Sequence, residues 1–211
     1  NINPQTIQQG QLIQIPAYVA QNYQIKSGDS LWSIAMSRNL PLDTLFLIHP
    51  TLNPNRLQIG QTIQVPLRIT WRLVNGKQNY DYEVMMNDIQ RLQTVYPFLQ
   101  VSSIGNSVLN RSIPEVLIGI GDKRVTYNGS FHANEWITTP TIMTFLNDYA
   151  LSLTNQTTIR GLITSPLYEQ TSLSIVPMVN PDGVNLVLNG PPELEPYRSN
   201  VIKWNNNSLD F

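Results

Sequence analysis

The stretch YQIKSGDSLWSIAMSRNL, residues 23–40, decides the fold of the first part of the chain. It opens with a short run that predicts a β-strand. Ser27-Gly28-Asp29 then predicts a turn, because these residue types favour turn conformations. Ser30 is a candidate N-cap for a following helix. The apolar residues of that helix recur at helical spacing and share one face: Leu31, Ile34 and Ala35.

Two later stretches complete a small module. DTLFLIHP predicts a second short helix that begins at Asp43 and that Pro50 stops. QTIQVP, residues 61–66, predicts a closing strand that Pro66 ends. The expected order of elements is therefore β-α-α-β.

The end of this module repeats an earlier part of the chain. NPNRLQIGQTIQVP, residues 53–66, shares its asparagine, prolines, glycine and aliphatic spacing with NPQTIQQGQLIQIP, residues 3–16. Agreement at this many positions indicates an internal repeat. We therefore expect the chain to begin inside an earlier copy of the module.

Composition limits the classes of partner and of site. The chain has 211 residues, which suits one or two domains, and its formal net charge of -1 gives no reason to expect nucleic acid as a partner. No apolar run is long enough to predict membrane insertion. Only 13% of the residues are charged, and abundant asparagine and glutamine suit a surface that faces uncharged polymers such as glycans, although polar loops share this composition. With no cysteine, any metal needs ligands from His, Asp or Glu.

The second part of the chain alternates predicted strands and helices, which favours an α/β sheet. A linker is expected over residues 68–79. Helices are predicted in YDYEVMMNDIQRLQTVYP, residues 80–97, and TTPTIMTFLNDYALSL, residues 138–153. Strands are predicted on both sides of a turn at Asn110-Arg111, before GSFHANEW, and in a buried run that breaks at Asn180. The second helix aligns these residues on one face: Ile142, Phe145, Leu146, Tyr149 and Leu153.

GSFHANEW, residues 129–136, contains a candidate metal pair. His132 follows the apolar strand end at Phe131, and α/β sheets place ligands at the carboxyl ends of their strands. Glu135 lies three residues on, and imidazole and carboxylate donors both suit zinc. The alternative is a solvated helix start, because a lone pair with this spacing is common.

The first module resembles the LysM module, over residues 20–67 in full and over residues 1–19 as the C-terminal part of another copy. The resemblance implies binding of N-acetylglucosamine-containing glycans, chiefly peptidoglycan or chitin, in a shallow groove between two loops. It assigns five residues to that groove: Gly28, Asp29, Ser30, Ile48 and Asn53. Alternatively, Gly28 and Asp29 only form a turn and Asn53 only caps one. His49, with no carboxylate at metal spacing, is expected to pack or to cap rather than to bind metal.

IGNSVLNRSI, GSFHANEW and VPMVNPDG together resemble the zinc carboxypeptidase family, the relatives of carboxypeptidase A. The resemblance covers residues 80–211 as the N-terminal part of the domain. It implies an eight-stranded mixed sheet flanked by helices and a Zn²⁺ cofactor that activates water, with His132 and Glu135 as two of its three protein ligands. A glutamate then acts as the general base.

Two departures from the family pattern bear on activity. Asn134 stands where many members have an arginine that holds the substrate backbone, which argues against ordinary carboxypeptidase specificity. No histidine follows His132 in the sequence. The third zinc ligand, the substrate-binding arginine and the catalytic glutamate are therefore expected beyond Phe211, and the 211 residues alone are expected to be inactive.

The combination of both parts resembles the bacterial γ-D-glutamyl-L-diamino acid endopeptidases. It implies cleavage between D-glutamate and the diamino acid of peptidoglycan stem peptides, with glycan strands and stem peptides as partners. The expected location is extracellular or in the bacterial cell wall, with the spore as one setting. The alternative is a non-catalytic peptidoglycan- or chitin-binding LysM protein whose peptidase-like domain is degenerate.

Overall fold

The computed structural model describes residues 15–191, 202–204 and 208–210. The described chain forms two compact units, of which one spans Tyr18–Ile69 and the other begins again at Thr70. The predicted tail of an earlier module, residues 1–19, falls mostly outside the described residues. Of its described residues, Ala17 belongs with the second unit, where its N–H donates to the carbonyl of Val95 at 2.8 Å.

The first unit has the predicted β-α-α-β order. Strand β1 (Tyr18–Gln24) is followed by helices α1 (Leu31–Met36) and α2 (Leu42–Ile48) and by strand β2 (Thr62–Arg68). The two strands pair antiparallel along their whole length, from Tyr18 opposite Arg68 to Gln24 opposite Thr62. Both helices pack against this hairpin, and the core lies wholly within the unit: Ile25, Leu31, Ile34, Ala35, Leu40, Leu45, Ile63 and Val65.

The prediction that Pro66 ends the closing strand was wrong. Strand β2 continues through Pro66, which lies opposite Ala20, as far as Arg68. In a two-stranded sheet each strand has a free edge, and proline is tolerated where no ladder N–H is needed. Sequence alone does not show which side of a strand is unpaired, so the proline was read as a stop.

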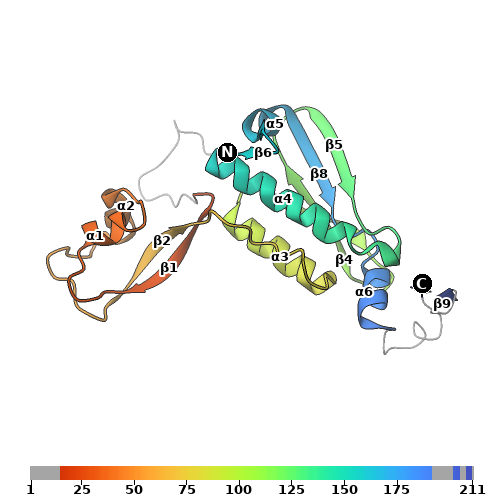
Figure 1. Ribbon diagram of the computed structural model, residues 1–211, viewed down its shortest axis with the longest axis horizontal. Helices are drawn as coiled ribbons and strands as arrows, with labels where there is room; N and C mark the ends of the chain where they lie inside the picture. Colours follow the sequence, from red (N-terminus) through yellow and green to blue (C-terminus); the bar gives the residue numbers. More distant parts are fainter. Residues whose placement is uncertain (1–14, 192–201, 205–207, 211) are drawn as a thin grey trace. The chain divides into compact units, whose positions relative to one another are not determined.

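The second unit contains a four-stranded mixed sheet in the order β3-β4-β8-β5. Strands β3 (Gln100–Asn106) and β4 (Ser112–Ile118) form the predicted hairpin around Asn110, and β4 also pairs antiparallel with β8 (Thr171–Val176). Strand β5 (Lys123–Asn128) runs parallel to β8. Because β5 and β8 point the same way, the loops that follow them meet at one edge of the sheet (Figure 1).

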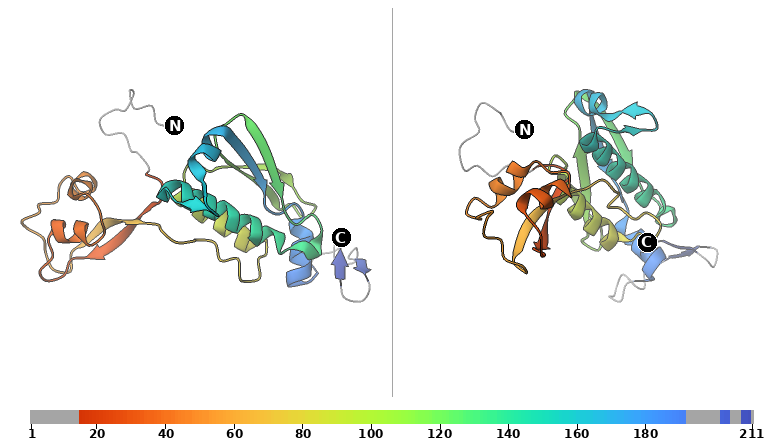
Figure 2. Two further views of the ribbon diagram at one scale, coloured as in Figure 1. Left: turned by 45° about the horizontal axis from the view of Figure 1, so that its top comes forward. Right: turned by 60° about the vertical axis from the view of Figure 1, so that its left-hand side comes forward.

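Helices α3 (Tyr82–Val95) and α4 (Thr138–Asn155) confirm the two long helices predicted from periodicity. They contact each other and lie along the sheet (Figures 1 and 2). The predicted face of α4 was only partly correct, since Leu146 and Tyr149 are buried whereas Phe145 is 37% exposed. The buried face of α4 also carries polar residues, which a hydrophobic count leaves out: Thr139, Asn147 and Ser152.

Shorter elements complete the unit. The 3₁₀ turn η2 (Ala133–Glu135) follows β5, and helix α6 (Pro181–Asn189) follows β8. The hairpin of β6 (Thr158–Ile159) and β7 (Leu162–Ile163) leads into helix α5 (Thr164–Gln170). Strands β9 (Ile202–Trp204) and β10 (Ser208–Asp210) pair with each other.

The segment predicted as a linker makes specific contacts with α4. The Oδ1 atom of Asn147 accepts the N–H groups of Leu73 and Val74 at 2.7 and 2.9 Å. Arg72 donates to both carboxylate oxygens of Asp148, at 2.5 and 2.6 Å. In the part of the chain that the structure describes, no helix is both long and apolar enough to span a membrane.

Candidate functional site

His132 and Glu135 lie in one short turn directly after strand β5. His132 is the N-cap residue of η2, and the N–H of Glu135 donates to the carbonyl of His132 at 3.0 Å. Both side chains are exposed, and no hydrogen bond or ion pair involves them among the described residues. The structure therefore leaves both donors available on the surface at the carboxyl end of β5, the strand at one side of the described four-stranded sheet, and the sequence predicts this position after a strand.

A network of hydroxyl groups supports this turn from the side of α4. Ser130 has a left-handed backbone conformation, with φ of 52°, and is only 2% exposed. Its N–H donates to Oγ1 of Thr138 at 2.7 Å, and Oγ1 of Thr138 donates to the carbonyl of Glu135 at 2.9 Å. Oγ of Ser130 also lies 2.7 Å from Oγ1 of Thr139. Left-handed φ costs a non-glycine residue free energy, so these contacts are what keep the backbone in this shape.

Helix α6 supports the turn from the other side. The N–H groups of Val179 and Asn180 donate to the carbonyls of Gly129 and Ser130, at 2.9 and 3.0 Å. A Cβ atom at Gly183 would lie 2.9 Å from Cβ of Ala133, so only glycine permits this approach of α6 to the turn. The turn is thus held between α4 and α6.

The third motif identified in the sequence joins the same assembly. The carboxylate of Asp182 is 5% exposed and accepts from Oγ of Ser107 at 2.9 Å, the N–H of Leu109 at 2.9 Å and Nη1 of Arg111 at 2.7 Å. IGNSVLNRSI, GSFHANEW and VPMVNPDG therefore meet in space through Arg111, Asp182 and the N-terminus of α6. Sequence reasoning singled out the three motifs but assigned no role to Asn180, Asp182 or Arg111.

The donor set fits zinc in part. An imidazole and a carboxylate are both ligands that zinc takes, and neither is engaged elsewhere in the described chain. A catalytic zinc needs three protein ligands, and the described residues contain no cluster of three or more His, Asp or Glu side chains that could hold a metal. His132 and Glu135 therefore fit as two members of a larger ligand set.

The candidate glycan residues surround the loops of the first unit. Gly28 has φ of 85° in the turn before α1. Oδ2 of Asp29 accepts from the N–H of Lys26 at 2.7 Å and from the hydroxyl of Tyr23 at 2.8 Å, and these bonds, the backbone one first, lower the pKa of Asp29. Ser30 forms a reciprocal capping box with Ser33. Each of these residues thus has a structural task, and glycan contact stays a prediction.

The other candidates lie at the opposite loop. Ile48 ends α2 and is 42% exposed, and Oδ1 of Asn53 accepts the N–H of Asn55 at 2.9 Å. His49 is the C-cap residue of α2, and its Nε2 lies 2.7 Å from the carbonyl of Gln64. His49 therefore occupies a capping position and binds a strand carbonyl, in agreement with the expectation that it packs or caps.

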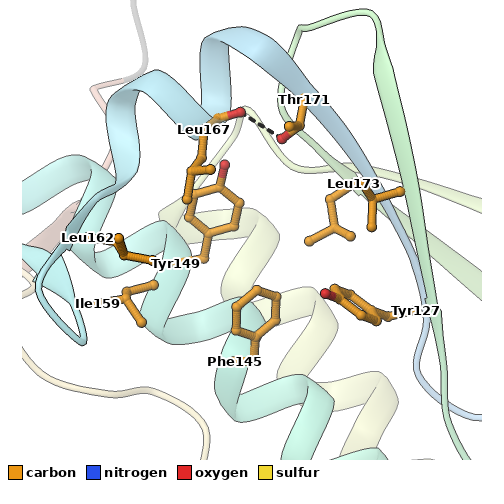
Figure 3. A pocket seen from close by; sticks show the side chains of 9 residues that line it. Tyr127, Phe145, Tyr149, Ile159, Leu162, Leu167, Thr171 and Leu173 are labelled. Carbon is orange, nitrogen blue, oxygen red and sulfur yellow. Dashed lines mark hydrogen bonds between the residues drawn. The ribbon is translucent and has the colours of Figure 1, made fainter.

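An apolar pocket lies elsewhere in the second unit, and it is not a plausible centre for hydrolysis. It measures about 210 Å³ and has the rings of Tyr127, Phe145 and Tyr149 around it (Figure 3). The hydroxyl of Thr171 donates to the carbonyl of Leu167 at 2.6 Å. The lining contains no carboxylate or imidazole that could transfer a proton or bind a metal: Val125, Tyr127, Phe145, Tyr149, Ile159, Leu162, Leu167, Thr171 and Leu173.

Comparison with known protein families identifies both parts of the chain. The model of the zinc carboxypeptidase family matches residues 85–208, and that of the LysM domain matches residues 23–66. The chain belongs to the zinc carboxypeptidase family. It also carries a LysM domain, and both resemblances deduced from the sequence are confirmed, as is the α/β fold class.

Two relatives extend the comparison. The whole chain is 67% identical to γ-D-glutamyl-L-diamino acid endopeptidase 1 of Lysinibacillus sphaericus and covers 53% of that protein. It is 38% identical to the uncharacterized protein YqgT of Bacillus subtilis strain 168, over 72% of this chain and 40% of YqgT. The chain thus spans about half the length of the first relative and less of the second.

Among solved structures, a LysM domain is similar to part of the chain. The LysM domain of a Volvox carteri chitinase is 42% identical, over 23% of this chain and 98% of that domain, with a TM-score of 0.22.

Proposed function

We propose that the protein is a zinc peptidase of the bacterial cell wall that cleaves the γ-D-glutamyl–diamino acid bond of peptidoglycan stem peptides. Family membership supports the peptidase class, and the name of the Lysinibacillus sphaericus relative supports the bond. The LysM domain supports peptidoglycan as the partner and an extracellular or cell-wall location. The observation that carries the proposal is the pair His132 and Glu135, unengaged at the carboxyl end of β5 and fixed by two helices.

His132 and Glu135 would each give one ligand to the metal. When bound, zinc lowers the pKa of a water molecule and polarises the scissile carbonyl. The contribution of this chain is to fix the backbone of the turn that carries both residues, so that only their exposed side chains have to be ordered when the metal binds. Asn134, between them, presents a neutral amide at the position where many family members have an arginine that holds the substrate backbone, which supports a specificity other than that of ordinary carboxypeptidases.

The LysM domain would hold the substrate polymer. Gly28, Asp29 and Ser30 would line one side of its glycan groove, and Ile48 and Asn53 the other. Short polar loops beside an exposed aliphatic residue suit a sugar ring, which has hydroxyl edges and an apolar face. Binding the glycan raises the local concentration of attached stem peptides for a catalytic domain on the same chain.

The test measures hydrolysis of a γ-D-glutamyl-diaminopimelate peptide by the intact protein. We expect turnover that a chelator abolishes and that zinc restores. His132→Ala and Glu135→Ala should each lower the turnover by about 100-fold or more, and each should also lower the zinc content of the protein. Glu169→Ala, at an exposed glutamate of α5, is the matched control and leaves both unchanged. Retention on insoluble peptidoglycan without turnover under any metal condition would instead show a non-catalytic wall-binding protein.

A further inference from the structure

Besides accepting the N–H of Val184 within α6, Asn180 makes three hydrogen bonds at the point where α6 meets the candidate metal turn. Its N–H donates to the carbonyl of Ser130 at 3.0 Å, and its Nδ2 donates to the carbonyl of Phe131 at 3.3 Å. Its Oδ1 accepts the N–H of Gly183 at 2.8 Å, which caps α6. One side chain thus connects the start of a helix with the peptide group that directly precedes His132.

The helix end that carries Asn180 is itself fixed. Asp182 is buried and accepts three hydrogen bonds from the β3–β4 loop, including the ion pair with Arg111. Further along α6, Oδ1 of Asn185 accepts the N–H of Tyr82 at 3.1 Å. The N-terminus of α6 is therefore anchored at points that do not involve His132 or Glu135.

The turn depends on such an anchor. Ser130, two residues before His132, has a left-handed backbone, a conformation that it would leave if its contacts were removed. On the α4 side, the bonds of Thr138 reach the N–H of Ser130 and the carbonyl of Glu135. On the α6 side, the direct side-chain bond to the carbonyl before His132 comes from Asn180.

We propose that Asn180 is a positioning residue for the metal pair, fixing the peptide before His132 so that its imidazole faces the same ion as the carboxylate of Glu135. The proposal rests on the proposed function, because it takes His132 and Glu135 as zinc ligands. Groups that orient metal ligands without touching the metal typically affect metal affinity by about 10- to 100-fold. Asn180 acts through a backbone carbonyl, so an effect near the lower limit is expected.

The experiment separates positioning from helix capping. Serine is as good an N-cap as asparagine, so Asn180→Ser keeps a cap for α6 but is too short to hold the carbonyl of Phe131. Zinc affinity of the intact protein is measured by competition with a chromophoric chelator, and the Tm of the apoprotein is measured in parallel. We expect Asn180→Ser to weaken zinc binding about 10-fold while the apoprotein Tm changes little.

Two further variants make the outcome decisive. Asn147→Ser removes a buried amide that holds Leu73 and Val74 on α4, away from the metal turn, and should lower the Tm without changing zinc affinity. His132→Ala should abolish tight zinc binding. Unchanged zinc affinity in Asn180→Ser, with loss in His132→Ala, would overturn the positioning role alone. Unchanged affinity in His132→Ala would overturn the proposed metal site itself.

Discussion

At the residue scale, Tyr96 shows how one buried hydroxyl sets a dependence on pH. The side chain is fully buried, and its hydroxyl has no hydrogen-bond partner among the described residues. Burial alone raises the pKa of Tyr96 to about 12. The cost of such a hydroxyl is the loss of its bond to water, which amounts to about 1 kcal/mol or more.

Tyr96→Phe should therefore stabilise the second unit by about 1 kcal/mol at neutral pH. The pKa of Tyr96 is higher in the folded state than in the unfolded state. Below about pH 10 the hydroxyl is neutral in both states, so stability does not depend on its ionisation, and stability then falls as the pH rises toward about 12. The variant should lack that part of the alkaline loss. Urea unfolding at pH 7 and pH 11 measures both effects. If the free energy of unfolding fell equally with pH in both proteins, Tyr96 would not be the source of the alkaline loss.

Asp29 gives the opposite dependence in the LysM unit. Hydrogen bonds from the Lys26 N–H and the Tyr23 hydroxyl lower its pKa, so its contribution to stability is present above the unfolded value, about 4, and is lost as the pH falls through the lower folded value. Asp29→Asn should lower the Tm at pH 7 and flatten its fall below pH 4. A variant whose Tm follows the wild-type acid curve would show that the turn does not depend on the carboxylate.

Residue-level prediction succeeded where the signal was local. Ser30 was predicted as an N-cap, and His49 was predicted to pack or to cap, because caps depend on a few neighbouring positions. Asn180, Asp182 and Arg111 received no role, because the bond between Arg111 and Asp182 joins residues 71 positions apart and no periodicity reports it. The roles of His132 and Glu135 as ligands rest on chemistry and family resemblance, and they stay a prediction.

At the element scale, capping and edge position explain both successes and errors. Helix α6 was missed because Asn-Pro-Asp-Gly was interpreted only as the break of a strand. The same residues give an N-cap at Asn180 and a proline at the first helical position, which is the usual start of a helix. The continuation of β2 past Pro66 depends on which strand edge is free, and that is decided by pairing rather than by composition.

Ser30 provides a test of an element end that also lies in the candidate glycan groove. Ser30→Ala removes the capping box of α1 and should destabilise the LysM unit by about 1 kcal/mol, whereas Ser30→Asp should retain most of that stability. Binding of the intact protein to insoluble peptidoglycan, compared between the two variants, separates the roles. Recovery of binding in Ser30→Asp would indicate that Ser30 only shapes the loop, whereas loss in both would support direct contact with the sugar.

At the scale of the whole molecule, the two units have separate cores and so separate stabilities. The LysM core is contributed entirely by residues of Tyr18–Ile69, whereas the second unit has its own large buried residues, including Met85, Leu146 and Met178. The sequence analysis expects two parts because each part carries its own pattern of apolar spacing. It did not predict that residues 72–74 bond to α4, since a short polar stretch between two patterns gives no signal of its partner.

The separate core predicts that residues 18–69 fold alone. Small cores are marginally stable, so the isolated segment should unfold cooperatively at modest temperature. Leu45 is fully buried, and Leu45→Ala should remove about 2–5 kcal/mol and unfold the segment. Leu47→Ala is the matched control, because Leu47 is 80% exposed on the same helix and its replacement should leave the Tm nearly unchanged.

NMR of the wild-type segment should show dispersed amide signals, and those near Gly28 and Asn53 should shift on titration with chitin oligomers. Amide signals without dispersion would contradict independent folding. Dispersed signals that do not shift at millimolar glycan would show that the segment folds but that its groove does not bind the glycan.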